Sequence, residues 1–86
     1  MNKETLLTFP CSYPIKIIGN ADNVESIALP ILRAHIPDLK DDMIIKHSSQ
    51  GDKYLALTVT FNAVSQEQID ALYIDLSSDK RLLMVL

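Results

Sequence analysis

The feature that most constrains the fold is a regular alternation of side chains over residues 53–62. Every second position holds a large apolar side chain, and these are Leu55, Leu57, Val59 and Phe61. The positions between them hold Tyr54, Ala56, Thr58 and Thr60. Because successive side chains of a strand point to opposite faces, the pattern predicts a strand with an apolar inner face and a mixed outer face.

Three further segments predict strands around this one. Residues 13–19 place Ile15 and Ile17 on one face, and Gly19 ends the run. Residues 43–48 precede a turn at residues 50–52, whose Gly-Asp chemistry predicts a hairpin leading into residues 53–62. Residues 80–86 predict a last strand.

The segment after residue 19 predicts a first helix. Asp22 is the expected N-cap, with Glu25 three residues later in a capping-box-like pattern. The apolar stripe expected to face the core consists of Val24, Ile27, Ala28 and Ile31. Pro30 predicts a kink or a break, because proline removes a backbone hydrogen bond, and Pro37 ends the element.

A second helix is predicted after residue 64. Ser65 is the expected N-cap, and Gln68 completes a Ser-x-x-Gln capping box. Its buried stripe is expected to be Ile69, Leu72, Tyr73 and Leu76.

The resulting order is strand, helix, strand, strand, helix, strand. Right-handed crossovers fold this order into an α+β, ferredoxin-like βαββαβ sandwich, a four-stranded antiparallel sheet with two helices on one face. The strands at 13–19 and 53–62 are then central, and the other two are edges. With 86 residues we expect one domain at residues 13–86, preceded by an N-terminal arm at residues 1–12.

Several short motifs also resemble a known family. Phe9-Pro10-x-x-Tyr13-x-x-Lys16-x-x-Gly19 opens the domain, Ser48-Ser49-x-Gly51 marks the hairpin, Leu72-Tyr73-x-x-Leu76 lies in the second helix, and Met84-Val85-Leu86 ends the chain. In this order and spacing they resemble the YbeD-like family of small bacterial proteins of unknown function. The resemblance implies a ferredoxin-like fold similar to the ACT regulatory domains that bind amino acids, and it implies no established activity. Pro30 and Lys53 depart from the family pattern.

Composition argues against several classes of function. The net charge of −3 and the scattered basic residues argue against nucleic-acid binding. The single cysteine, Cys11, cannot form an intramolecular disulfide and cannot supply the paired thiolates of a metal carrier. No apolar run near the N-terminus is long enough for a membrane span. We therefore expect a cytoplasmic protein that is not an enzyme, with no cofactor, no metal site and no catalytic residue.

Two loops are candidates for binding a small ligand. The loop of Gly19, Asn20, Ala21 and Asp22 runs into a helix N-terminus, and in ACT-like domains the equivalent loop contacts the effector. The turn with Ser48, Ser49 and Gly51 exposes backbone N–H groups that suit a carboxylate or phosphate. Alternatively, these serines only satisfy the backbone of a tight hairpin.

The last strand is a candidate interface because it is apolar on both faces. Its residues are Leu82, Leu83, Met84, Val85 and Leu86. Such a strand at a sheet edge should be covered, either by a second copy in a homodimer or by Leu6, Leu7 and Phe9 of the arm.

Two functional hypotheses remain open. One is a regulatory module that binds a small-molecule effector, such as an amino acid, and acts on a separate protein partner or a second copy of this chain. The other is a protein-interaction or dimerisation module without a small ligand.

Overall fold

Two long strands form the centre of the sheet. The computed structural model describes residues 8–86, in which β1 (Cys11–Asn20) and β3 (Tyr54–Ala63) pair antiparallel along their full lengths. The register runs from Cys11 opposite Ala63 to Asn20 opposite Tyr54. The alternation at residues 53–62 therefore predicted the central strand correctly, with each boundary one residue too early.

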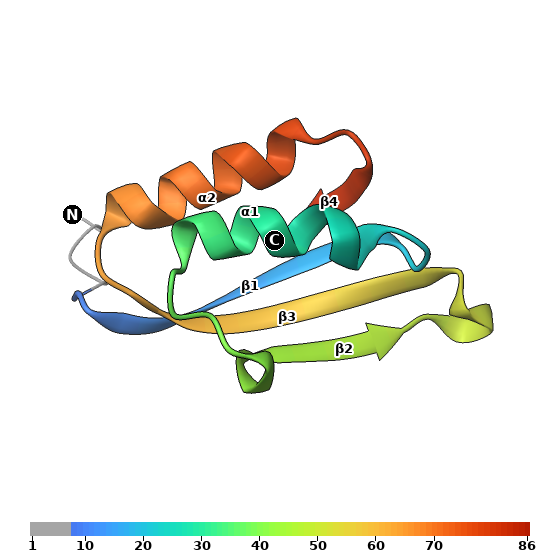
Figure 1. Cartoon of the computed structure of the whole chain (residues 1–86), viewed down its shortest axis with the longest axis horizontal. Coiled ribbons are helices and arrows are strands. Elements are labelled where there is room, and N and C mark those ends of the chain that lie inside the picture. Colours follow the sequence, from blue (N-terminus) through green and yellow to red (C-terminus); the bar gives the residue numbers. More distant parts are fainter. Residues whose placement is uncertain (1–7) are drawn as a thin grey trace, which may run out of the picture.

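Two shorter strands form the edges of the sheet. β2 (Ile44–Ser48) pairs with β3, and β4 (Leu82–Val85) pairs with β1, which gives the strand order β2-β3-β1-β4. With α1 (Val24–His35) and α2 (Gln66–Ser78), the chain has the βαββαβ order of a ferredoxin-like α+β fold. Figure 1 shows the two helices running alongside each other over the sheet. The predicted fold and the predicted central and edge strands are confirmed.

The core lies between the helices and one face of the sheet. The alternating residues of the central strands are buried on this face: Ile15, Ile17, Leu55, Leu57, Val59 and Phe61. The helices contribute Val24, Ile27, Ala28, Leu32, Ile69, Leu72 and Leu76. All are less than 9% exposed, so the period of two in the strands and the helical stripes meet in a single core.

The start of α1 differs from its prediction. A turn closed by the Asn23 N–H and the Asn20 carbonyl (3.1 Å) shifts the first helical residue to Val24, so Asn23 and not Asp22 precedes the helix. The Asn23 side chain makes no capping hydrogen bond. The predicted capping box is therefore absent from this end of α1.

The body of α1 also corrects two expectations. Leu32 is buried in place of Ile31, which is only partly buried. The helix continues through Pro30 without a break, and the proline lies on the exposed side of the helix. The helix then ends at His35, two residues before Pro37, as predicted.

The start of α2 follows its prediction closely. The Ser65 Oγ accepts a hydrogen bond from the Gln68 N–H at 3.1 Å. The Gln68 Oε1 accepts from the Val64 N–H at 2.8 Å, one residue before the N-cap that a capping box would use. The Gln68 Nε2 donates to the His35 carbonyl at 2.8 Å, so this side chain joins the start of α2 to the end of α1.

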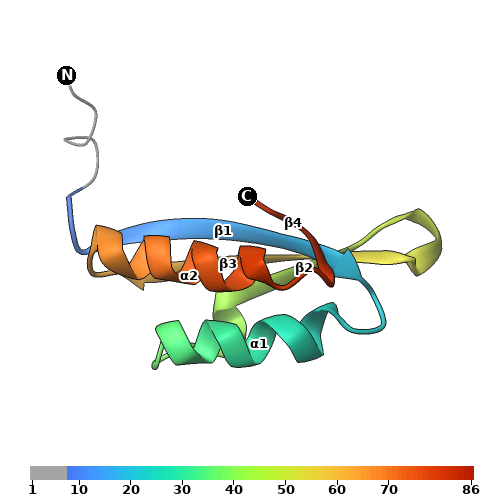
Figure 2. The same cartoon turned by 90° about the horizontal axis from the view of Figure 1, so that it is seen from above.

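The loops at the hairpin end of the sheet differ in detail from the prediction. The turn between β2 and β3 spans Gln50–Asp52 and is not a regular helix, because Gly51 (φ 83°) and Asp52 (φ 56°) adopt left-handed backbone conformations. Figure 2 shows the loop between β1 and α1 at this same end of the molecule. The Ala21 N–H donates to the Lys53 carbonyl at 3.0 Å and ties the two together.

Part of the predicted N-terminal arm can be placed. Leu6 and Leu7 lie outside the described residues, so their predicted cover of the last strand stays a prediction. Phe9 is partly buried against the core. β1 itself begins at Cys11, two residues before the expected start of the domain.

Candidate functional site

The loop predicted to bind a ligand has little free backbone. Gly19 is buried against α1, and a Cβ atom at this position would lie 2.9 Å from the Val24 Cγ2. The N–H groups of Ala21 and Asn23 already donate to the carbonyls of Lys53 and Asn20. The described contacts of this loop are therefore structural, and ligand binding at residues 19–22 stays a prediction.

The serine-containing turn is closed by its own backbone. The Ser49 Oγ accepts from the Tyr54 N–H at 2.9 Å, and the Ser49 N–H donates to the Tyr54 carbonyl at 2.9 Å. The Asp52 N–H donates to the Ser49 carbonyl at 2.9 Å. These bonds agree with the alternative that the serine satisfies the hairpin backbone. Ser48 and Gly51 are exposed beside it.

The last strand presents apolar side chains to solvent. Leu82 is buried, and Val85 packs partly against the core. By contrast, Leu83 is 54% exposed, Met84 50% and Leu86 57%. The Lys16 and Leu86 backbones exchange two hydrogen bonds, so the ladder between β1 and the last strand reaches residue 86.

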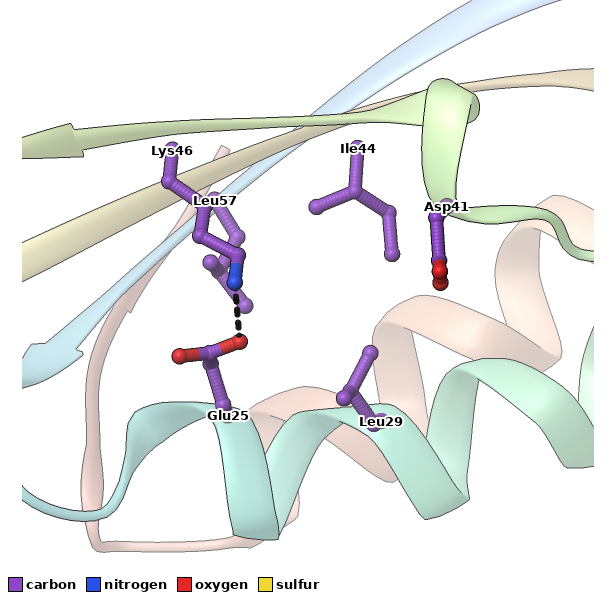
Figure 3. A pocket seen from close by; sticks show the side chains of 6 residues that line it. All are labelled: Glu25, Leu29, Asp41, Ile44, Lys46 and Leu57. Carbon is purple, nitrogen blue, oxygen red and sulfur yellow. Dashed lines mark ion pairs between the residues drawn. The ribbon is translucent and has the colours of Figure 1, made fainter.

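A pocket that the sequence did not indicate lies between α1 and β2 (Figure 3). It has a volume of about 270 Å³ and is lined by Glu25, Leu29, Asp41, Ile44, Lys46 and Leu57. Glu25 and Leu29 come from neighbouring turns of α1. Ile44 and Lys46 lie on the helix-facing side of β2, opposite Val59 and Leu57 of β3.

The charged groups of this pocket lie at its two ends. The Lys46 Nζ and the Glu25 Oε2 form an ion pair at 2.7 Å, with the two side chains 54% and 40% exposed. Figure 3 shows this pair at one end and Asp41 at the other, with Leu29 and Ile44 between them. The pocket thus combines an apolar wall with polar groups of both signs of charge.

The sequence contains the spacing of the pocket residues within each element, but it does not show that the two elements lie together. Glu25 and Leu29 are four residues apart, so a helix places them on one face. Ile44 and Lys46 are two apart, so a strand places them on one face. Only the packing of α1 against β2 brings these two pairs together, and a single sequence does not give that packing.

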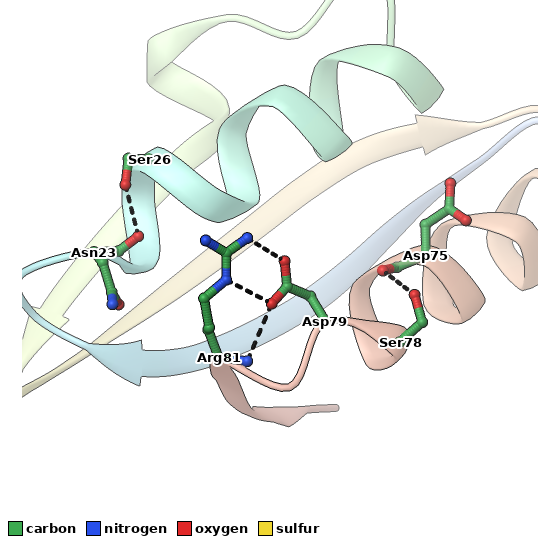
Figure 4. Close-up of polar contacts among 6 residues, drawn as sticks. All are labelled: Asn23, Ser26, Asp75, Ser78, Asp79 and Arg81. Carbon is green, nitrogen blue, oxygen red and sulfur yellow. Dashed lines mark hydrogen bonds and ion pairs between the residues drawn. The ribbon is translucent and has the colours of Figure 1, made fainter.

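The end of α2 carries a local charged cluster (Figure 4). Asp79 accepts hydrogen bonds from the Arg81 N–H at 3.0 Å, from Nε at 2.9 Å and from a terminal guanidinium nitrogen at 2.7 Å. The Arg81 guanidinium lowers the pKa of Asp79 to about 2. Asp79 and Arg81 are two residues apart in the same turn, so their contacts stabilise the connection between α2 and β4.

Other polar contacts are equally local or join the two helices. The Ser26 Oγ donates to the Asn23 carbonyl and the Ser78 Oγ to the Asp75 carbonyl, each at 3.0 Å (Figure 4). The His35 Nε2 lies 2.5 Å from the Asp75 Oδ2, which links α1 to α2. None of these contacts involves a pocket residue.

The chemistry of the described residues offers few reactive groups. Cys11 is a free, partly buried thiol. Within residues 8–86, no three histidine, cysteine, aspartate or glutamate side chains are grouped as a metal would need. Nor is any helix in this range both long and apolar enough to cross a membrane.

Two tyrosines pack at the far end of the sheet from the hairpin. Burial raises the pKa of Tyr73 to about 12, and a hydrogen bond with Tyr13 adds to the increase. The Tyr13 ring meets the Phe61 ring edge to face, with the ring centres 6.1 Å apart. These contacts favour the neutral phenol of Tyr73 and give both rings a packing role.

Comparison with known proteins supplies the family. Residues 4–86 match the family described as "Protein of unknown function (DUF493)". A UPF0250 protein of Chromobacterium violaceum is 36% identical over 98% of this chain and 96% of its own length. UPF0250 proteins of Nitrosomonas europaea (39% identical, 85% of each chain) and Hahella chejuensis (37%, 93% of this chain and 89% of the relative) are also similar.

No solved structure matches the chain. The family match spans nearly the whole sequence, and the relatives are bacterial proteins of about the same length. The predicted resemblance to the YbeD-like proteins is thereby confirmed. The chain belongs to the DUF493 family, the small bacterial UPF0250 proteins of unknown function.

Proposed function

We propose that the protein is a non-catalytic regulatory module that binds a small metabolite in the pocket between α1 and β2. The observation that carries the proposal is the pocket itself, in which Glu25, Asp41 and Lys46 surround an apolar wall of Leu29, Ile44 and Leu57. Its volume of about 270 Å³ suits a metabolite smaller than a drug-sized ligand.

The position of the pocket supports a regulatory role. It lies between α1 and the edge strand β2, so a bound molecule contacts both elements at once. A ligand that binds only one arrangement of these elements shifts the population toward it, and a partner protein can detect the shift. The single Cys11 and the absence of an intramolecular disulfide support placing this module in the cytoplasm.

The test is a titration followed by ¹⁵N NMR, with amino acids, nucleotides and organic acids at millimolar concentration. We expect saturable shifts at the amides of residues 25–29 and 41–46 with at least one compound. The variant Leu29→Phe, which fills the pocket, should weaken these shifts. The control Ile74→Phe places the same ring on the exposed face of α2 and should leave them unchanged. Shifts that gather only at residues 19–22 or 48–51 would contradict this choice of site.

A second function is favoured by the exposed apolar side chains at the end of the chain. Leu83 and Met84 of the edge strand β4, and Leu86 directly after it, are each half exposed or more. Antiparallel pairing of two β4 strands about a two-fold axis would cover the edge and produce a homodimer.

The dimer is tested by sedimentation equilibrium. Met84→Lys should convert a dimer to a monomer, because it places a charge in the centre of the paired strands. Ile45→Lys is the matched control, since Ile45 is equally exposed on the opposite edge strand. A wild-type mass of one chain at high concentration, or a dimer that survives Met84→Lys, would reject the β4 interface.

A further inference from the structure

The charges that line the pocket define the class of ligand it fits. Two side chains, Glu25 and Asp41, are carboxylates, and one, Lys46, is an ammonium group. A ligand that pairs with all three must carry two positive charges and one negative charge. The pocket thus has a specific charge requirement in addition to its shape.

The arrangement of these charges specifies where the ligand charges must be. Glu25 and Lys46 are in contact at one end, so a ligand needs an ammonium and a carboxylate close together there. Asp41 lies at the other end, beyond Leu29 and Ile44 (Figure 3). The second positive charge must therefore be separated from the first two by an apolar segment.

We infer that the ligand is a basic α-amino acid, of the lysine, ornithine or arginine class. Its α-carboxylate pairs with Lys46, its α-ammonium with Glu25 and its side-chain cation with Asp41. The aliphatic part of the side chain crosses the wall formed by Leu29 and Ile44. This inference rests on the proposed function and assigns the chemistry of the same pocket.

The existing ion pair does not prevent binding. Both of its side chains are about half exposed, and ion pairs in this setting are worth no more than about 1 kcal/mol. Separating Glu25 from Lys46 therefore costs little when each gains a ligand group in exchange. The exchange keeps both charges paired.

Other ligand classes match the pocket less well. A neutral α-amino acid leaves Asp41 without a partner. A diamine leaves Lys46 without an anionic partner. A dicarboxylate or phosphate meets two carboxylates and only one ammonium group, so repulsion opposes it.

The test compares three compounds of nearly equal size by isothermal titration calorimetry and ¹⁵N NMR. L-Lysine carries all three charges, L-norleucine lacks the side-chain ammonium, and 1,5-diaminopentane lacks the carboxylate. We expect L-lysine to bind about tenfold more tightly than either, because each loses one charge-assisted contact. L-Glutamate should bind most weakly of the amino acids.

Variants assign each contact. Asp41→Asn should remove the preference for L-lysine over L-norleucine, and Lys46→Met should remove the preference for L-lysine over 1,5-diaminopentane. Asp42→Asn is the control, since Asp42 is the exposed neighbour of Asp41 and does not line the pocket. It should leave both preferences intact.

The outcomes separate this inference from the proposed function. If L-norleucine or L-glutamate binds in the pocket as tightly as L-lysine, the basic-amino-acid inference is wrong and the pocket remains a metabolite site. If basic amino acids shift no pocket amide but a different metabolite does, the basic-amino-acid inference is again wrong and the pocket is still a metabolite site. If none of the compounds shifts these amides, the basic-amino-acid inference and the proposed function are both wrong.

Discussion

At the residue scale, the two glycines of the chain are needed for different reasons. Gly19 has an ordinary strand conformation but no room, because an added Cβ would lie 2.9 Å and 3.0 Å from two atoms of Val24. Gly51 has open space around it but a left-handed φ of 83°. One position therefore excludes side chains by contact and the other by backbone conformation.

Substitutions at the two glycines should separate these causes. Gly19→Ala should lower the free energy of unfolding by about 1–3 kcal/mol, because α1 must move away from β1. Gly51→Ala should cost about 1 kcal/mol from backbone strain. Gly51→Asn should be nearly neutral, since asparagine tolerates this conformation. Urea unfolding measures all three, and a Gly19→Ala protein as stable as wild type would contradict the close contact with Val24.

Tyr73 gives a prediction for alkaline pH. Its folded-state pKa of about 12 lies above its ordinary value of 10.0, so the fold favours the protonated phenol. The stabilisation is complete below pH 10 and is lost as pH rises from 10 to 12. Wild type should therefore lose stability over this range more steeply than Tyr73→Phe, as thermal unfolding at each pH will show. Parallel curves for the two proteins would rule out this coupling.

At the element scale, α1 shows how a helix accommodates an interior proline. Pro30 lacks the N–H that would donate to the Ser26 carbonyl, yet α1 runs unbroken from Val24 to His35. The helix persists because its opposite side buries Ile27, Ala28 and Leu32, and tertiary packing outweighs local propensity. The proline therefore weakens α1 without ending it.

Replacing this proline should stabilise the protein. Pro30→Ala restores a backbone hydrogen bond and should raise the free energy of unfolding by about 2 kcal/mol, after the greater freedom of the unfolded chain is included. Pro37→Ala is the control and should lower the free energy of unfolding, since Pro37 lies beyond the helix and only restricts the unfolded chain. Urea midpoints that fail to rise for Pro30→Ala would mean that the helix has already adapted to the proline.

The sequence predicted the elements well because each has a local cause. The alternation around Leu57 requires a strand, and Ser65 with Gln68 places the start of α2. The start of α1 was missed because Asp22 and Asn23 are both good cap residues, and only the preceding turn decides between them. The pocket was missed because its residues come from two elements whose packing is not a local property.

At the scale of the whole molecule, the Gln68 side chain connects three parts of the fold. It accepts a hydrogen bond from Val64, which follows β3, and donates one to the carbonyl of His35, at the end of α1. The nearby pair of His35 and Asp75 joins the same two helices. The two helices, each of which connects two strands of the sheet, are thus fixed to each other near one end of the sheet.

Truncating this side chain should destabilise the whole fold. Gln68→Ala leaves a part-buried carbonyl and an N–H without partners and should lower the free energy of unfolding by about 2 kcal/mol. Gln66→Ala, which removes only an exposed contact with Asp70, should cost less than about 0.5 kcal/mol. Equal losses in chemical denaturation would show that the connection between the helices contributes nothing.

The pairing of β1 with β3 also determines when the chain can fold during synthesis. The ladder joins residues 11–20 to residues 54–63, so the first strand waits for its partner until α1 and β2 have been made. During that interval Ile15 and Ile17 cannot be buried between the sheet and the helices, and contacts between distant segments form slowly. The nascent chain therefore folds late, because β1 and β2 both pair with β3 and neither ladder can form before β3 has left the ribosome.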